Sequence, residues 1–107
     1  MSVRIEKDGP VWTIIHSRYE ARNAMDPQSA VDLFEAFQAF DKDQSAYVGV
    51  FWGEGGAFCS GWDLKYASTL SGLDALDPHD FPDKGVPPMA LMGPSRLNLS
   101  KPIIAAV

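Results

Sequence analysis

The sequence of 107 residues is poor in several features that mark particular classes of protein. It has one cysteine, Cys59, so an internal disulfide is excluded and a reducing compartment is favoured. It has no apolar run near the roughly 20 residues that cross a bilayer, and its charged N-terminus lacks the apolar core of a signal peptide. We therefore expect a cytoplasmic protein with no membrane partner.

Basic residues are also few. The sequence has nine Lys and Arg residues against 14 Asp and Glu residues, which gives a formal net charge of -5, and the basic residues are scattered along the chain. A nucleic-acid surface needs clustered Lys and Arg, so no nucleic-acid partner is expected. The two histidines are far apart and no second cysteine exists, so no metal site is expected. A small phosphorylated ligand stays compatible with an acidic chain, because it meets only its local site.

Hydrophobic periodicity predicts an α/β fold of at most one domain. Asp26 followed by Pro27, with apolar residues at spacings of three and four behind them, predicts a helix over residues 27–40. Strands are predicted at residues 3–7 and 11–16, which form a hairpin, and at residues 47–52 and 102–107. The order strand, helix, strand indicates a right-handed crossover in a mostly parallel sheet.

The C-terminal third of the chain has a different character. Residues 71–94 are rich in Gly, Asp and Pro without a sustained period, which predicts a long variable loop that is a candidate for mobility. The last residues, Lys101–Val107, have the pattern of a buried strand, which needs neighbours on both sides. We therefore expect residues 1–107 to be the N-terminal part of a single, longer domain.

A glycine-rich turn is the most informative local feature. Four glycines occur within residues 53–61, between the strand at 47–52 and a helix predicted from Asp63 to about Leu70. Glycines let a ligand approach main-chain N–H groups, and open α/β sheets bind ligands where a strand ends. The spacing fits neither the P-loop nor the dinucleotide fingerprint, so an ordinary strand-to-helix connection stays an alternative. No activating base or nucleophile elbow marks Cys59 or Ser60, so packing is expected of Cys59 and a peptide N–H role of Ser60.

Three motifs together resemble the N-terminal portion of the crotonase (enoyl-CoA hydratase/isomerase) superfamily. They are Arg18–Met25, Gly55–Leu64 and Lys101–Val107, in this order. The resemblance implies a ββα spiral fold, trimer-based homo-oligomers, and a coenzyme A thioester as substrate, without a prosthetic group. Two positions depart from the usual pattern: Tyr19 stands where Pro is usual, and Trp62 where small residues are common.

The resemblance also implies a set of site residues. The peptide N–H of Ser60 is the candidate catalytic group, as one half of an oxyanion hole for the enolate of the thioester. Arg22 and Lys65 have an alternative role as solvated surface charges, and Trp62 has an alternative role as a packing residue. Asp63 is expected to cap the following helix. The candidate substrate- and CoA-binding residues are Glu20, Ala21, Arg22, Ser60, Gly61, Trp62, Asp63, Leu64 and Lys65.

The favoured function is that of an acyl-CoA lyase or isomerase of fatty acid metabolism, of which this chain supplies the N-terminal, thioester-binding portion. In the family the second oxyanion donor and the acid/base glutamates follow the strand that residues 102–107 resemble. We therefore expect the 107 residues alone to be inactive. The alternative is a non-catalytic CoA-binding or assembly module that lacks those glutamates.

Overall fold

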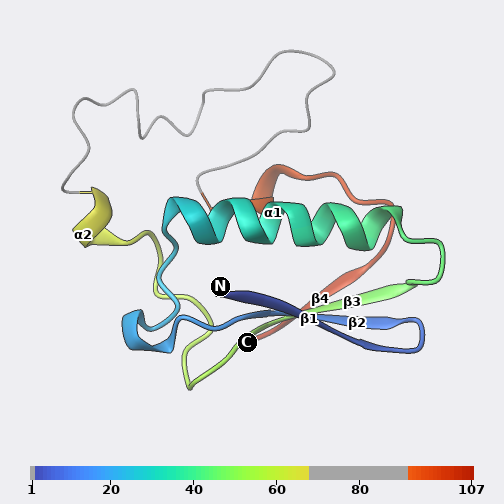
Figure 1. Cartoon of the computed structure of the whole chain (residues 1–107), viewed down its shortest axis with the longest axis horizontal. Helices are drawn as coiled ribbons and strands as arrows, with labels where there is room; N and C mark the ends of the chain where they lie inside the picture. The colour runs from blue at the N-terminus through green and yellow to red at the C-terminus, as the bar shows by residue number, and fades with distance from the viewer. Residues whose placement is uncertain (1, 68–91) are drawn as a thin grey trace, which may run out of the picture.

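The computed structural model describes residues 2–67 and 92–107, which form a sheet with a long helix across one of its faces (Figure 1). Within these residues the sheet has four strands in the order β1-β2-β3-β4. The strands are β1 (Val3–Asp8), β2 (Val11–His16), β3 (Val48–Gly53) and β4 (Ile103–Ala106). The helical elements are the α-helices α1 (Pro27–Lys42) and α2 (Leu64–Ala67), and the 3-10 helices η1 (Tyr19–Ala21) and η3 (Pro94–Arg96).

The strand directions confirm the predicted topology. β1 and β2 are antiparallel and form a hairpin that turns at Gly9, whose φ of 58° suits a residue without a side chain. β3 is parallel to β2, and β4 is parallel to β3. Because α1 connects β2 to β3, the unit is the predicted crossover, and the carboxyl ends of β2, β3 and β4 lie at the same edge of the sheet.

Helix α1 begins where the sequence predicts and ends two residues later than expected. The Asp26 carboxylate accepts a hydrogen bond from the Ser29 N–H at 2.9 Å, and Pro27 fills the first helical position. At the other end, the Lys101 ammonium donates to the carbonyl oxygens of Phe40, at 3.0 Å, and of Asp43. This lysine precedes β4, so it links the entry of that strand to the end of the helix.

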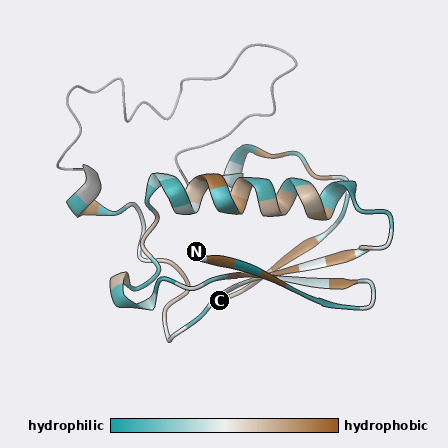
Figure 2. Ribbon diagram, in the orientation of Figure 1, coloured by the Kyte–Doolittle hydropathy of each residue, from teal (hydrophilic) through white to brown (hydrophobic). Residues whose placement is uncertain are grey.

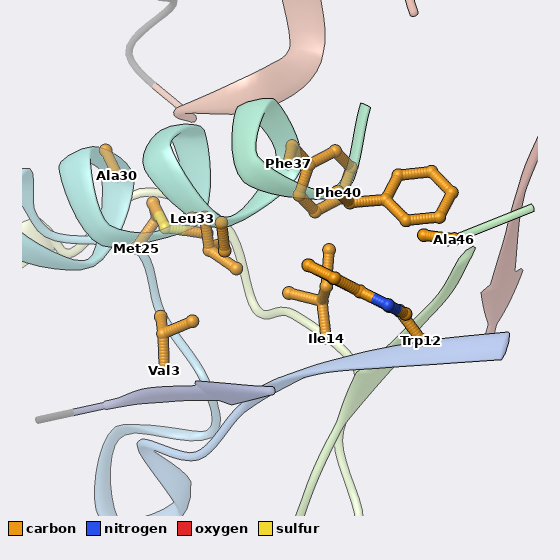
Figure 3. Packing of buried hydrophobic residues seen from close by; sticks show 10 residues of the cluster. Val3, Trp12, Ile14, Met25, Ala30, Leu33, Phe37, Phe40 and Ala46 are labelled. Atoms are coloured by element: carbon orange, nitrogen blue, oxygen red, sulfur yellow. The ribbon is translucent and has the colours of Figure 1, made fainter. Parts of the chain in front are cut away.

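The hydrophobic core lies between α1 and the sheet (Figure 3). Leu33 and Phe40 of the helix are fully buried, and the Phe40 ring meets Trp12 of β2 at a centroid distance of 5.9 Å. The helix sits close to the sheet at Gly49, where a Cβ would lie 3.2 Å from the Phe40 ring. Hydrophobic and hydrophilic residues alternate around α1, as the periodic spacing predicts (Figure 2).

The remaining predictions fall partly beyond what the structure describes. β4 lies within the strand predicted at residues 102–107, but most of its residues are exposed in the described structure, whereas the apolar run predicts a buried strand. α2 begins one residue after Asp63. The predicted loop at 71–94, apart from residues 92–94, and the end of the helix predicted to Leu70 lie outside the described residues. Within residues 2–67 and 92–107, no helix is long and apolar enough to cross a membrane.

Candidate functional site

The glycine-rich turn starts at the last residue of β3, and its first glycine is required by close packing. A Cβ on Gly53 would lie 2.8 Å from the Cα of Phe58 and 2.9 Å from the carbonyl oxygen of Ala57. The turn therefore folds back directly over Gly53. The Phe58 ring packs against Phe51 of β3 with centroids 5.1 Å apart, which anchors the returning chain to the sheet.

Asn23 joins the turn to the segment that follows β2. Its side chain is fully buried, and its Nδ2 donates to the carbonyl oxygens of Glu54, at 2.8 Å, and Ala57, at 2.6 Å. Its Oδ1 accepts a hydrogen bond from the Arg18 N–H at 2.6 Å. The residue has a φ of 56°, in the left-handed region that Asn adopts more readily than most residues. One amide side chain thus satisfies three main-chain groups of two segments.

A short parallel bridge sets the direction of the turn's last residues. The Met25 N–H donates to the Gly61 carbonyl at 2.7 Å, and the Asp63 N–H donates to the Met25 carbonyl at 2.7 Å. Main-chain groups alternate in direction along an extended chain. The N–H and C=O of Trp62 therefore point away from Met25.

Ser60 lies on the exposed side of the turn. Its hydroxyl donates to the carbonyl oxygen of Ala21 at 3.3 Å. Among residues 2–67 and 92–107, no acceptor is hydrogen-bonded to the Ser60 N–H. The turn thus offers a main-chain donor next to a hydroxyl that is tied to the facing segment.

Arg18 forms an ion pair across the same junction. Its guanidinium donates to the Asp63 carboxylate at 2.7 Å and to the Ala24 carbonyl at 2.9 Å, and it lies 3.5 Å from the Asp26 carboxylate. The other oxygen of Asp63 accepts from the Lys65 N–H at 2.9 Å, so Asp63 caps the start of α2 as predicted. Burial alone would raise the pKa of Asp26, but the hydrogen bonds from Ser29 and the charge of Arg18 lower it below its usual value.

A cleft of about 770 Å³ opens between the two segments that these contacts join. It contains three cationic and two anionic side chains, so its lining carries a net charge of +1 within a chain of net charge -5. The side chain of Leu64 is 80% exposed, which leaves an apolar group at the cleft. The lining residues are Arg18, Glu20, Ala21, Arg22, Ala24, Ser60, Trp62, Asp63, Leu64 and Lys65.

Eight of the nine residues predicted to bind substrate line this cleft, although they come from segments about 40 positions apart in the sequence. The ninth, Gly61, bonds to Met25 through its carbonyl. Sequence reasoning included Arg18 and Asn23 in the motif Arg18–Met25, and through the resemblance it expected the segment from Glu20 to Asn23 to line the path of the CoA, but it did not predict the contacts that either side chain makes. Their place in the sequence could have indicated a role at the site, because both follow β2 at the edge of the sheet where the parallel strands end, and so face the turn that follows β3.

Two further titratable groups lie near the carboxyl ends of the strands. His16, the last residue of β2, is 1% exposed, and neither ring nitrogen has a hydrogen-bond partner among the described residues. Burial, with a contribution from Arg18, lowers its pKa and favours the neutral ring. Glu54 forms two hydrogen bonds with Arg4, at 2.7 and 3.1 Å. These bonds, with a smaller contribution from Ser17, lower the pKa of Glu54 to about 2. In the described part of the chain, no group of three or more His, Cys, Asp or Glu side chains is placed to hold a metal ion.

The sequence is similar to a family with a described activity. The family profile described as enoyl-CoA hydratase/isomerase matches residues 6–85. A carnitinyl-CoA dehydratase of Salmonella arizonae is 35% identical over 108 residues, which covers 99% of this chain and 38% of the relative. A probable peroxisomal enoyl-CoA hydratase 1 of Arabidopsis thaliana is 35% identical over 81 residues, which covers 75% and 31%.

The fold is similar to solved structures with related descriptions. A carnitinyl-CoA hydratase from Mycobacterium avium superimposes with a TM-score of 0.78 and 29% sequence identity, covering 99% of this chain and 38% of that one. The chain therefore spans less than two-fifths of the length of each of these three relatives.

Proposed function

Because this chain belongs to the enoyl-CoA hydratase/isomerase family and has its crotonase fold, we propose that the cleft binds an acyl-CoA thioester and polarises its carbonyl group. One observation carries this proposal. Residues 18–25 and 60–65, which are far apart in sequence, are joined by hydrogen bonds and an ion pair and together line one cleft. The lining of that cleft includes cations, an apolar group and residues of the glycine-rich turn, which suit the phosphates, the pantetheine arm and the thioester respectively.

The chemical step that the turn would assist is the accumulation of negative charge on the thioester oxygen. Hydration and isomerisation of an enoyl thioester both pass through an enolate, and each preorganised N–H donor lowers the barrier by about 3 kcal/mol. We propose the Ser60 N–H as a donor, because Ser60 is an exposed residue of the turn that lines the cleft. The Trp62 N–H is a second candidate, because the bridge between Met25 and Trp62 directs this N–H away from Met25.

The charged end of the ligand is assigned to the two cations at the mouth of the cleft, Arg22 and Lys65. Both are exposed lining residues. Asp63 is paired with Arg18, so its negative charge is compensated at short range. A phosphate group at this place would therefore meet a locally positive surface although the chain is acidic.

Calorimetric titration with coenzyme A tests the binding proposal. We expect saturable binding that weakens about tenfold in the R22A/K65A variant, since two ionic contacts of under 1 kcal/mol each are lost. Dephospho-CoA, which lacks the 3′-phosphate, should be less sensitive to the same substitutions. Lys42 is a matched control, since it is exposed at the far end of α1, and K42A should leave the affinity unchanged. Equal affinities of R22A/K65A and K42A for CoA would refute the assignment of the cations.

The activity of the whole protein follows from the family as a further proposal. We propose that it is an acyl-CoA lyase or isomerase of fatty acid metabolism in the cytoplasm, assembled as a homo-oligomer built from trimers. The non-catalytic module is the competing proposal. Turnover of crotonyl-CoA by the longest natural form of the protein, with none by these 107 residues, supports the enzyme. CoA binding without turnover by that longest form supports the module.

A further inference from the structure

The junction of the two cleft-forming segments contains a charged group, the Arg18 guanidinium, to which the proposed binding scheme assigns no contact with the ligand. Arg18 follows β2 by two residues, and two hydrogen bonds to Asn23 fix its main chain independently of the contacts that its side chain makes. Its N–H donates to Asn23 Oδ1 at 2.6 Å, and its carbonyl accepts from the Asn23 N–H at 2.9 Å. The guanidinium therefore projects from a fixed base.

The guanidinium reaches groups on both walls of the cleft. One amino group bonds to the Ala24 carbonyl on its own side, and the other bonds to the Asp63 carboxylate on the opposite side. The side chains of Arg18 and Asp63 are 22% and 12% exposed, so water screens this pair less than a surface pair. A planar guanidinium holds two such acceptors in a fixed geometry that an ammonium cannot reproduce.

The ion pair lies directly beside the main-chain bridge that directs the turn. Ala24 precedes Met25, and Asp63 is the residue whose N–H donates to the Met25 carbonyl. Holding Ala24 and Asp63 on one guanidinium therefore holds the two strands of the bridge in register. The bridge in turn sets the direction of the Trp62 N–H.

The pair also sets the charge of the cleft. With Arg18 present, the lining has three cations and two anions, a net charge of +1. Without it, two cationic and two anionic side chains would remain, and the lining would carry no net charge.

From these contacts we infer that Arg18 is a positioning residue of the cleft: it fixes the bridge between Met25 and residues 61–63 and neutralises Asp63 towards an anionic ligand. This inference rests on the proposed function for its second half only. Its first half concerns the free protein.

Amide hydrogen exchange of the free chain tests the first half. In R18Q and in D63N, the Met25 and Asp63 amides should exchange at least about tenfold faster than in the unsubstituted chain, while the amides in the middle of α1 keep their rates. The control is R4Q, which removes a different ion pair of the same turn, between Arg4 and Glu54, and should leave the exchange of both amides unchanged. Unchanged exchange at Met25 and Asp63 would overturn the inference. So would an equal increase throughout α1, because Arg18 would then only stabilise the fold.

Coenzyme A titration of the same variants tests the second half. R18Q should bind CoA at least about fivefold more weakly, and the double variant R18Q/D63N should recover to within about twofold of the unsubstituted chain, because the cleft lining then again carries a net charge of +1. A double variant as weak as R18Q would overturn the charge role. If the unsubstituted chain binds no CoA, the proposed function fails, whereas the exchange experiment still decides the positioning role.

Discussion

Replacing Gly53 with alanine is the sharpest test of how the turn is built. The added Cβ would lie 2.8 Å from the Cα of Phe58, whereas ordinary contacts begin at 3.4 Å. The carbonyl oxygen of Phe58 would lie closer still, so the returning chain would have to move by at least about 0.6 Å, the difference between these distances. The obstructing atoms are main chain, and Phe58 is also anchored to Phe51, so no flexible side chain can give way. We expect a loss of about 2–3 kcal/mol in the free energy of unfolding, the upper part of the range of about 1–3 kcal/mol for overpacked sites.

Gly9 provides the matched control for this substitution. It has a φ of 58°, and no atom lies within 4 Å of the position that an alanine methyl group would take, so G9A carries backbone strain alone, about 1 kcal/mol. Urea denaturation of both variants measures the difference. G53A should also weaken the binding of acyl-CoA, because its displaced chain leads into Ser60, and G9A should not. If G53A proves no less stable than G9A, the close approach of the turn to β3 is wrong.

Three further substitutions test other contacts. N23D replaces the amide that donates to Glu54 and Ala57 with a buried carboxylate facing two carbonyls, so it should cost at least about 3 kcal/mol in urea denaturation. The folded-state pKa of His16 is below its usual 6.5, so below that pH the unfolded chain binds the extra proton and stability falls. In H16L, the free energy of unfolding should fall less steeply below this pH, by up to about 1.4 kcal/mol per pH unit. If the dependence of stability on pH is the same in H16L as in the unsubstituted chain, His16 is excluded as the source of the loss. R4M should raise the pKa of Glu54 from about 2 towards 4.5 in an NMR titration, unless the two hydrogen bonds from Arg4 are absent in solution.

Most of the fold could be predicted because its signals are local. Alternating residues and the turn at Gly9 specify the hairpin, and Asp26, Pro27 and the apolar spacing behind them specify α1. The position of the glycine-rich turn after β3 was enough to expect a site there. These features depend on residues a few positions apart, where backbone preferences decide the outcome.

The contacts that hold the site together could not be predicted in the same way. Asn23 bonds to carbonyl groups 31 and 34 positions later, and Arg18 to a carboxylate 45 positions later. Any buried Asn can satisfy many different main-chain groups, so its partners are decided only when the sheet brings two segments together. The conformation of Asn23, with its positive φ, likewise follows from that packing and not from the residue type alone.

The carbonyl stretching frequency of bound crotonyl-CoA tests the central claim most directly. Raman difference spectroscopy should show the thioester C=O stretch at lower frequency in the complex than in water, because N–H groups of the turn polarise the bond. Replacing the Ser60 amide with an ester removes that single N–H and should return the frequency towards its value in water. The same replacement at Trp62 tests the second donor. A stretch that is unshifted on binding, or a shift that survives both replacements, would contradict the account.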